Sequence, residues 1–139
     1  MLRPCFILLL MTRTLISLKQ DIGKTVKLRS LNDKYPDYFV SIKSQGADNR
    51  VVISNSGVDD EWIVRNGLAG EGISLESVTG TGYIRHSYSQ AWVDPLKNEG
   101  LYKNDTSFTV EDGLAGKGIS LRSVYFPNHL LRWYDDRTE

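Results

Sequence analysis

Apolar and polar residues alternate along several short runs of the chain. From Val26 to Leu31, Lys27 and Arg29 stand between apolar or small residues. A period of two is typical of a strand with one buried face. Similar runs follow to the end of the chain, separated by Gly, Pro, Asn and Asp, which favour turns. Because no stretch keeps a sustained helical period, the pattern predicts an all-β domain.

The predicted strands fall into three units. The first unit has strands at 26–31, 38–43, 50–54 and 61–64, the second at 73–78, 83–86, 91–94 and 107–110, and the third at 119–124 and 129–134. Three units of about 40 to 50 residues, each with four short strands, predict a β-trefoil closed around a pseudo-threefold axis. A β-propeller also has four strands per blade, but three blades are too few to close one. The third unit ends after its second strand.

A glycine-rich stretch sets the spacing of the units. Residues 67–78 return as 113–124, 46 residues later, with 10 of 12 positions identical. At the two differences, positions 71 and 76 carry Glu whereas positions 117 and 122 carry Lys and Arg. A position that accepts either sign is expected in water, whereas the Ile, Leu and Val of the stretch are expected in the core.

The first 24 residues stand apart from the domain predicted over 25–139. Residues 6–11 form an apolar run, too short to span a bilayer, that is either signal-like or a buried strand. No small-x-small cleavage site follows, and the first alanine is Ala47. We expect 6–11 and 15–18 to supply the two strands that the third unit lacks. The alternative is an open edge, which is prone to pair with another chain.

Charge balance and cysteine count limit the classes of partner and site that we expect. The 139 residues make one domain the default, and 17 basic residues balance 17 acidic ones. Nucleic acid or an anionic membrane as main partner would require a concentrated positive field, so we expect neither. Cys5 is the only cysteine, which excludes an intramolecular disulfide and a cysteine-based metal site. We expect no cofactor and no metal. Composition leaves the oligomeric state open.

Six strings of residues, in this order, carry a family resemblance: 73–78, 83–86, 104–110, 113–116, 119–124 and 130–132. Together they resemble the arabinose-binding (AbfB) domain attached to fungal and bacterial α-L-arabinofuranosidases, which is carbohydrate-binding module family 42. The resemblance implies a β-trefoil that binds arabinofuranose side chains of arabinoxylan or arabinan in plant cell-wall hemicellulose and does no chemistry itself. It also implies a secreted or extracellular protein.

The resemblance further implies where the sugar binds. Each pocket of that family uses the histidine of a Leu-Arg-His motif and the aspartate of an Asp-Ala-Thr-Phe motif. The second unit keeps both, as His86 and Asp105. The first has Asp59, with Ile42 where the histidine belongs, and the third has Trp133 there and ends before any aspartate. One complete pocket, one doubtful and one absent are therefore implied.

Two physical devices would bind a sugar at the complete pocket. Asp105 would accept hydrogen bonds from hydroxyls, each worth about 1.5 to 3 kcal/mol when charge-assisted, with His86 as donor or orienting partner. Tyr83, Tyr88 and Trp92 would supply aromatic surface for the C–H face of the ring.

Structural roles for the same residues remain open. An Asp shortly before a strand is commonly a turn residue. Trp92 could either belong to the core or serve as a platform for the sugar ring. Trp62 and Phe108 share one repeat position and are expected in the core. Arg85 alternates with His86, so one of them points inward. The resemblance puts His86 toward the pocket and leaves Arg85 to pack or to pair with a carboxylate.

Catalysis is not expected. A glycosidase needs two opposed carboxylates about 5 to 9.5 Å apart, whereas 59–61 and 135–136 offer only adjacent ones. No nucleophile elbow, metal-ligand cluster or phosphate loop is present. The sequence favours a carbohydrate-binding module. The alternatives are a trefoil interaction scaffold that has lost sugar binding and the accessory domain of an arabinofuranosidase.

Overall fold

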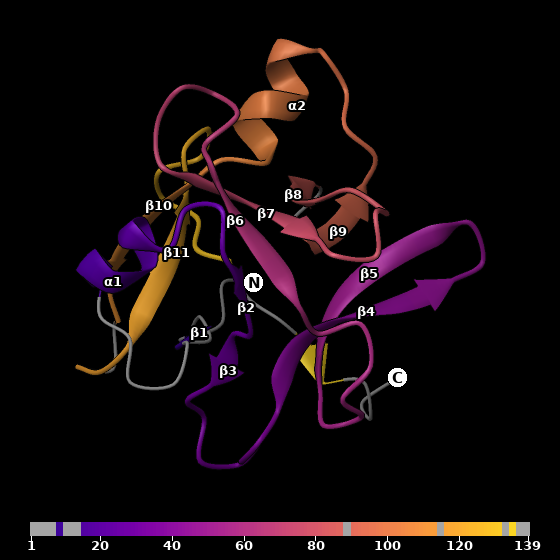
Figure 1. Cartoon of the computed structure of the whole chain (residues 1–139), viewed down its shortest axis with the longest axis vertical. Coiled ribbons are helices and arrows are strands. Elements are labelled where there is room, and N and C mark those ends of the chain that lie inside the picture. The colour runs from indigo at the N-terminus through magenta and orange to yellow at the C-terminus, as the bar shows by residue number, and fades with distance from the viewer. Residues whose placement is uncertain (1–7, 10–14, 88–89, 114–115, 132–133, 136–139) are drawn as a thin grey trace.

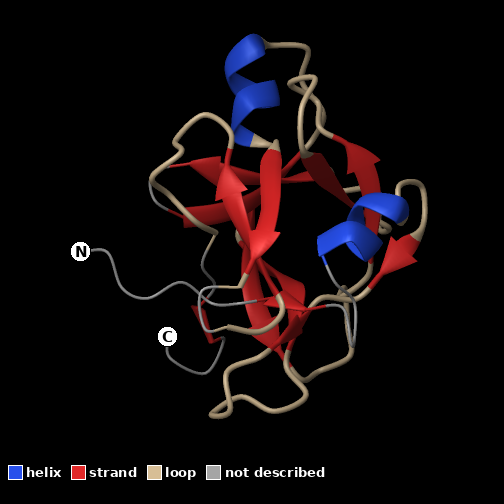
Figure 2. Cartoon of the chain, turned by 90° about the vertical axis from the view of Figure 1, so that its left-hand side faces the viewer, coloured by secondary structure: helices blue, strands red, loops and turns tan. Residues whose placement is uncertain are grey.

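The computed structural model describes residues 8–9, 15–87, 90–113, 116–131 and 134–135, and strands dominate this part of the chain (Figure 1). The strands are β1 (Leu8–Leu9), β2 (Thr25–Val26), β3 (Arg29–Ser30), β4 (Phe39–Gln45), β5 (Asp48–Ser54), β6 (Trp62–Asn66), β7 (Ile73–Ser77), β8 (Tyr83–Ser87), β9 (Gln90–Asp94), β10 (Phe108–Asp112), β11 (Ile119–Ser123) and β12 (Tyr134–Asp135). The all-β prediction is confirmed. Two short helices that the sequence did not predict, α1 (Leu15–Gln20) and α2 (Gly100–Asp105), lie outside the strands (Figure 2).

The described strands form one curled sheet. Its order is β10-β11-β1-β3-β4-β5-β9-β8-β7-β6-β2, and an added pairing of β10 with β7 bends the sheet back on itself. The β4–β5 hairpin projects to one side, whereas α2 caps the end near β8 and β9 (Figure 1). Among the described residues, no helix is long and apolar enough to cross a membrane.

The core gathers the apolar residues of the repeated strands. Trp62 and Phe108 are fully buried, as expected from their shared repeat position, and Trp62 Nε1 donates a hydrogen bond to the Val40 carbonyl at 2.9 Å. Within the doubled stretch, Ile73 and Leu75 are buried, but Val78 is 44% exposed. The prediction of a core position for Val78 is therefore wrong, because β7 has already ended at Ser77.

The two copies of the glycine-rich stretch have the same strand register. Trp62 lies opposite Ser77 in the β6–β7 pair, and Phe108 lies opposite Ser123 in the β10–β11 pair. Of the sign-exchanged positions, Glu71 and Lys117 are exposed, whereas Glu76 and Arg122 are half-buried on β7 and β11 and each pairs with a residue of the neighbouring strand. Arg65 bonds Glu76 at 2.9 Å, and Arg122 bonds Glu111 at 2.6 Å, with the charges reversed.

The N-terminal strand β1 lies between β11 and β3 in the sheet. Leu8 lies opposite Ile119 on one side and Ser30 on the other. Phe108 has the corresponding two partners, Ile73 and Ser123. Leu8 and Phe108 therefore have equivalent strand partners, because Ile119 and Ile73, like Ser30 and Ser123, hold matching places.

The predicted strand at 15–18 is wrong, since these residues begin helix α1. Leu8 and Val26 are 18 residues apart in the sequence, whereas Phe108 and Ile119 are 11 residues apart. The connection from β1 to β2 is thus seven residues longer, and Leu15–Gln20 within it form the short helix α1. Leu18 of that helix is fully buried, which anchors the connection in the core.

Two other predicted strands differ from the structure. The strand at 26–31 is divided into β2 and β3, although its alternation is confirmed, with Val26 and Leu28 buried and Lys27 exposed. Of the strand predicted at 129–134, residues 129–131 form no strand, and residues 132 and 133 lie outside the described residues. Leu130 makes one isolated bridge with Arg122, and β12 pairs in parallel with β5.

Candidate functional site

The β8–β9 hairpin sorts the candidate residues onto two faces. Arg85 lies opposite Trp92, and Tyr83 lies opposite Asp94, so these four side chains share the outer face. His86 lies opposite Ala91 on the other face, whose members include the fully buried Ile84. The alternation predicted for Arg85 and His86 therefore places Arg85 outside and His86 toward the core.

Asp105 lies with Arg85 on the outer face. Arg85 Nε and Nη2 donate to Oδ2 of Asp105 at 3.2 and 3.1 Å, and Nη1 donates to Oδ2 of Asp94 at 3.2 Å. Among the described residues no donor reaches Oδ1 of Asp105. Burial acts to lower the pKa of Arg85, but its hydrogen bonds to Asp105 and Asp94 outweigh burial and raise it. Arg85 is therefore a fixed cation between two carboxylates.

Helix α2 holds Asp105 in position. Tyr102 is fully buried, its hydroxyl donates to the Asp94 carbonyl at 2.8 Å, and its ring centroid lies 5.5 Å from Arg85 Cζ. Just after the helix, the hydroxyl of Thr106 donates a hydrogen bond to the Tyr102 carbonyl at 2.9 Å. Burial, followed by the charge of Asp94, raises the pKa of Tyr102 beyond its ordinary range. Sequence reasoning missed Asp94 and Tyr102, although the Arg85–Asp94 spacing across a predicted hairpin pointed to Asp94.

His86 belongs to a different cluster. Its ring centroid lies 5.6 Å from that of Phe126 and 5.4 Å from that of His129, both in edge-on contact. Nδ1 of His86 is buried without a hydrogen-bond partner. Burial, followed by the neighbouring His129, lowers the pKa of His86, while the charge of Asp105 acts in the opposite direction.

The remaining candidates are placed less favourably. Tyr83 is 8% exposed and offers little ring surface, and Trp92 is half-buried. Tyr88, like Trp133 of the third unit, lies outside the described residues. Asp59 is exposed in a left-handed backbone conformation with φ of 52°, and its carbonyl accepts from the backbone N–H of Ile42 at 3.1 Å.

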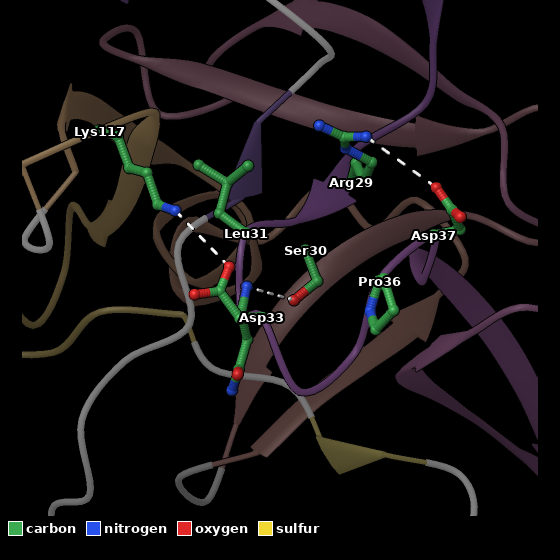
Figure 3. Close-up of a pocket in the computed structure, with 8 residues that line it drawn as sticks. Arg29, Ser30, Leu31, Asp33, Pro36, Asp37 and Lys117 are labelled. Atoms are coloured by element: carbon green, nitrogen blue, oxygen red, sulfur yellow. Dashed lines mark hydrogen bonds and ion pairs between the residues drawn. The ribbon is translucent and has the colours of Figure 1, made fainter.

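A cavity of about 220 Å³ lies elsewhere, between the loop after β3 and the turn before β11 (Figure 3). Lys117 faces Asp33 across it at 3.9 Å, and Arg29 faces Asp37 at 4.0 Å. It contains none of the predicted sugar-binding residues. No group of three or more His, Cys, Asp or Glu side chains able to hold a metal occurs in the part of the chain that the structure describes.

Solved structures resemble this fold closely. A GH54 α-L-arabinofuranosidase soaked with a cyclic sulfate inhibitor matches with a TM-score of 0.69 and 26% identity, over 81% of this chain and 24% of that chain. An arabinofuranosidase complexed with arabinofuranosyl-α-1,2-xylobiose matches with a TM-score of 0.70 and 25% identity, over 81% and 25%. A lysenin pore, 10% identical with a TM-score of 0.59 over 78% and 38%, shares the fold alone.

The chain thus spans about a quarter of the length of these arabinofuranosidases. A search of curated proteins finds no match. The family profile of the alpha-L-arabinofuranosidase B (ABFB) domain matches residues 26–139, which is most of the chain and includes both faces of the β8–β9 hairpin. The chain belongs to the alpha-L-arabinofuranosidase B (ABFB) domain family.

Proposed function

We propose that the chain is a non-catalytic carbohydrate-binding module for L-arabinofuranosyl side chains of arabinoxylan or arabinan. Family membership supports this role, as does likeness to an arabinofuranosidase whose structure contains arabinofuranosyl-α-1,2-xylobiose. The observation that carries the proposal is Asp105, a buried carboxylate of which Arg85 engages only one oxygen.

This arrangement suits a neutral sugar. Arg85 fixes Oδ2 of Asp105, so the carboxylate is oriented before a ligand arrives and Oδ1 can accept from a hydroxyl. The half-buried ring of Trp92 shares this face and can pack against the C–H side of a furanose. Tyr83 supports the site by packing and offers no surface to the sugar, because its ring is buried.

The first unit does not offer the same arrangement. Asp59 is exposed, and Ile42, which stands at the repeat position of His86, packs partly buried against the core. We therefore place the arabinofuranosyl site in the second unit and not in the first.

We also propose that the sheet is a β-trefoil. In this arrangement Leu8, Trp62 and Phe108 hold equivalent places, opposite Ser30, Ser77 and Ser123 respectively. The short β1 then stands for the missing fourth strand of the third unit. Within an arabinofuranosidase such a module would be the accessory domain that holds the enzyme on its polysaccharide, and both would work outside the cell.

The proposal is tested by titrating the protein with an arabinoxylo-oligosaccharide in a calorimeter. We expect weak binding at millimolar concentrations, because a single site lacks the gain from several sites acting together. Asp105→Asn keeps the shape of the side chain, and we expect it to weaken binding at least tenfold. Asp59→Asn is the matched control at the equivalent repeat position and should bind like the parent. Equal affinity of parent and Asp105→Asn would exclude Asp105 as the sugar-binding carboxylate, and no binding by the parent would favour an interaction scaffold.

A further inference from the structure

The cavity of about 220 Å³ between the loop after β3 and the turn before β11 is lined by charges of both signs (Figure 3). Lys117 faces Asp33 with Nζ–Oδ1 at 3.9 Å, and Arg29 faces Asp37 with Nη1–Oδ1 at 4.0 Å. We call the cavity lined by these four residues the mixed-charge cavity. Both separations exceed the length of a hydrogen bond, so the opposite charges attract one another without bonding directly.

The two cations keep donors that are not in use. Arg29 is the least exposed of the four charged residues, and its Nε is buried without a hydrogen-bond partner. Within the part of the chain that the structure describes, the side chains of Arg29 and Lys117 have only these two long ion pairs as polar contacts. Buried donors in proteins are as a rule paired, because an unpaired one is costly. Arg29 is therefore a group whose polar contacts a ligand would improve.

The loop that forms one wall of the cavity is held in a fixed shape. The Ser30 hydroxyl accepts from the backbone N–H of Asn32 at 3.2 Å, and Oδ1 of Asn32 accepts from the N–H of Lys34 at 3.0 Å. The N–H of Tyr35 donates to the Asn32 carbonyl at 2.8 Å. The rings of Tyr35 and Tyr38 are buried with centroids 5.5 Å apart, which anchors the loop in the core. The wall is thus in place before a ligand arrives.

The opposite wall is the turn between β10 and β11, which belongs to the second copy of the glycine-rich stretch. The N–H of Gly113 donates to the Gly118 carbonyl at 2.9 Å, and the N–H of Gly116 donates to the Gly113 carbonyl at 3.0 Å. Lys117 projects from this turn into the cavity (Figure 3). The first copy has the exposed Glu71 at the same place, so the turn itself does not require a cation there. The positive charge of Lys117 is specific to the copy that lines the cavity.

The separation within each ion pair suits a bridging hydroxyl. An oxygen about 2.8 Å from both charged atoms of a pair would have them at an angle of about 90°. A hydroxyl in that position can accept from the nitrogen and donate to the carboxylate, since it has one donor and two acceptor sites. The two pairs together could hold two hydroxyls of one molecule. Leu31 and Pro36 add apolar surface for its C–H groups.

We propose that the mixed-charge cavity is a second, separate site for a neutral sugar residue, in which one hydroxyl bridges Lys117 and Asp33 and another bridges Arg29 and Asp37. None of the residues that line it belongs to the Asp105 site, so one oligosaccharide need not reach both places. The cavity volume of about 220 Å³ lies below the range of roughly 300 to 1,000 Å³ for drug-sized ligands and therefore suits one sugar ring.

The charges favour a neutral ligand over a charged one. Two cations and two carboxylates line the cavity, so their formal charges cancel. An anion would be repelled by Asp33 and Asp37, and a cation by Arg29 and Lys117, whereas a hydroxyl interacts well with both signs. The two carboxylates are 100% and 85% exposed, compared with the buried Asp105, so we expect weaker binding here than at Asp105.

The site is tested by NMR titration of the protein with D-xylose and L-arabinose, which are neutral, and with D-glucuronate, which is charged. The backbone N–H signals of Asp33 and Lys117 report on the cavity, and the indole N–H of Trp92 reports on the face that holds Asp105. The Asp105→Asn variant is titrated in parallel. We expect the neutral sugars to shift the cavity signals equally in the parent and in Asp105→Asn.

Two cavity variants and a matched control complete the test. Lys117→Gln and Asp37→Asn each remove one charge, and Asn tolerates the left-handed backbone of Asp37, which has φ of 58°. Glu71→Gln removes a charge at the equivalent position of the other copy. We expect Lys117→Gln and Asp37→Asn to weaken D-xylose binding at the cavity about three- to tenfold, and Glu71→Gln to bind like the parent.

The two proposals fail in different ways. If neither neutral sugar shifts the Asp33 and Lys117 signals at about 100 mM, or if Lys117→Gln binds like Glu71→Gln, the cavity is not a sugar site. Trp92 shifts that Asp105→Asn abolishes would leave the proposed function standing in either case. Tighter binding of D-glucuronate than of both neutral sugars would also overturn the inference, because the cavity would then be an anion site.

Discussion

Arg85 and Asp105 come from different elements and meet through two hydrogen bonds to one carboxylate oxygen, at 3.2 and 3.1 Å. Arg85 stands in the middle of β8, and Asp105 is the last residue of α2. The pair ties the helix to the sheet and at the same time orients the carboxylate that we assign to sugar binding. Structure and recognition therefore depend on the same contact.

Asp105→Asn should lower the free energy of unfolding by about 1 to 3 kcal/mol, because the charge-assisted bonds to Arg85 are lost. Arg85 keeps Asp94 as its second partner, with Nη1–Oδ2 at 3.2 Å, so the fold should survive. Urea denaturation measures the change. Asp59→Asn, which is exposed, should stay within about 0.5 kcal/mol of the parent. Equal loss in the two variants contradicts the role of the pair.

Leu8→Pro should destabilise the protein by about 1 to 3 kcal/mol. The backbone of Leu8 is paired on both sides, with Ile119 and with Ser30, and proline cannot donate to a ladder. Leu96→Pro makes the same exchange in an exposed loop and should have little effect. If Leu8→Pro unfolds at the same denaturant concentration as the parent, β1 does not close the sheet in solution.

The Arg65–Glu76 ion pair can be tested by exchanging its two charges, because the equivalent pair Glu111–Arg122 has the opposite order. Glu76→Arg alone sets a positive charge against Arg65 and should cost about 0.5 to 1 kcal/mol, since both side chains are partly exposed. Adding Arg65→Glu recreates the charge order of Glu111 and Arg122, and we expect most of the loss to be recovered. Thermal unfolding of the two single variants and the double variant gives the coupling. If the stability losses of the two single variants simply add in the double variant, the ion pair does not stabilise the pairing of β6 with β7.

Protonation of His86 should make the stability of the protein fall at mildly acidic pH. Burial, together with His129, lowers the pKa of His86 below the ordinary 6.5, so below 6.5 the unfolded chain takes up a proton that the folded chain refuses. The contribution to stability is complete above pH 6.5 and is lost as the pH falls from there to the folded pKa. Denaturant titrations from pH 7.5 to about 5 should show this decline. His86→Gln should flatten it, and an unchanged slope in that variant assigns the decline to other groups.

The repeat spacing predicted most of the sheet because strand register depends on local alternation. Trp62 and Phe108, 46 residues apart, are both buried and both face a serine of the next strand. The helices were missed for a related reason. Six residues such as those of α1, Leu15–Gln20, are too few to distinguish a helical period from alternation.

The candidate site was harder to predict because its contacts join distant segments. Alternation required Arg85 and His86 to point opposite ways, but which of them meets Asp105 depends on the unpredicted helix α2. Tyr83 was expected at the surface and is buried because of packing between elements. Phe126 carried no signal in the sequence, since its place beside His86 arises only when the third unit folds against the second.

Recognition of arabinofuranosyl groups is the central claim, and one comparison tests it most directly. Calorimetric binding should be measured with arabinoxylan and with the same polysaccharide after enzymatic removal of its arabinosyl groups. The Asp105 site predicts binding to the decorated polysaccharide and binding weaker by at least tenfold after the groups are removed. Equal affinity for the two polysaccharides, or none for either, would contradict the account.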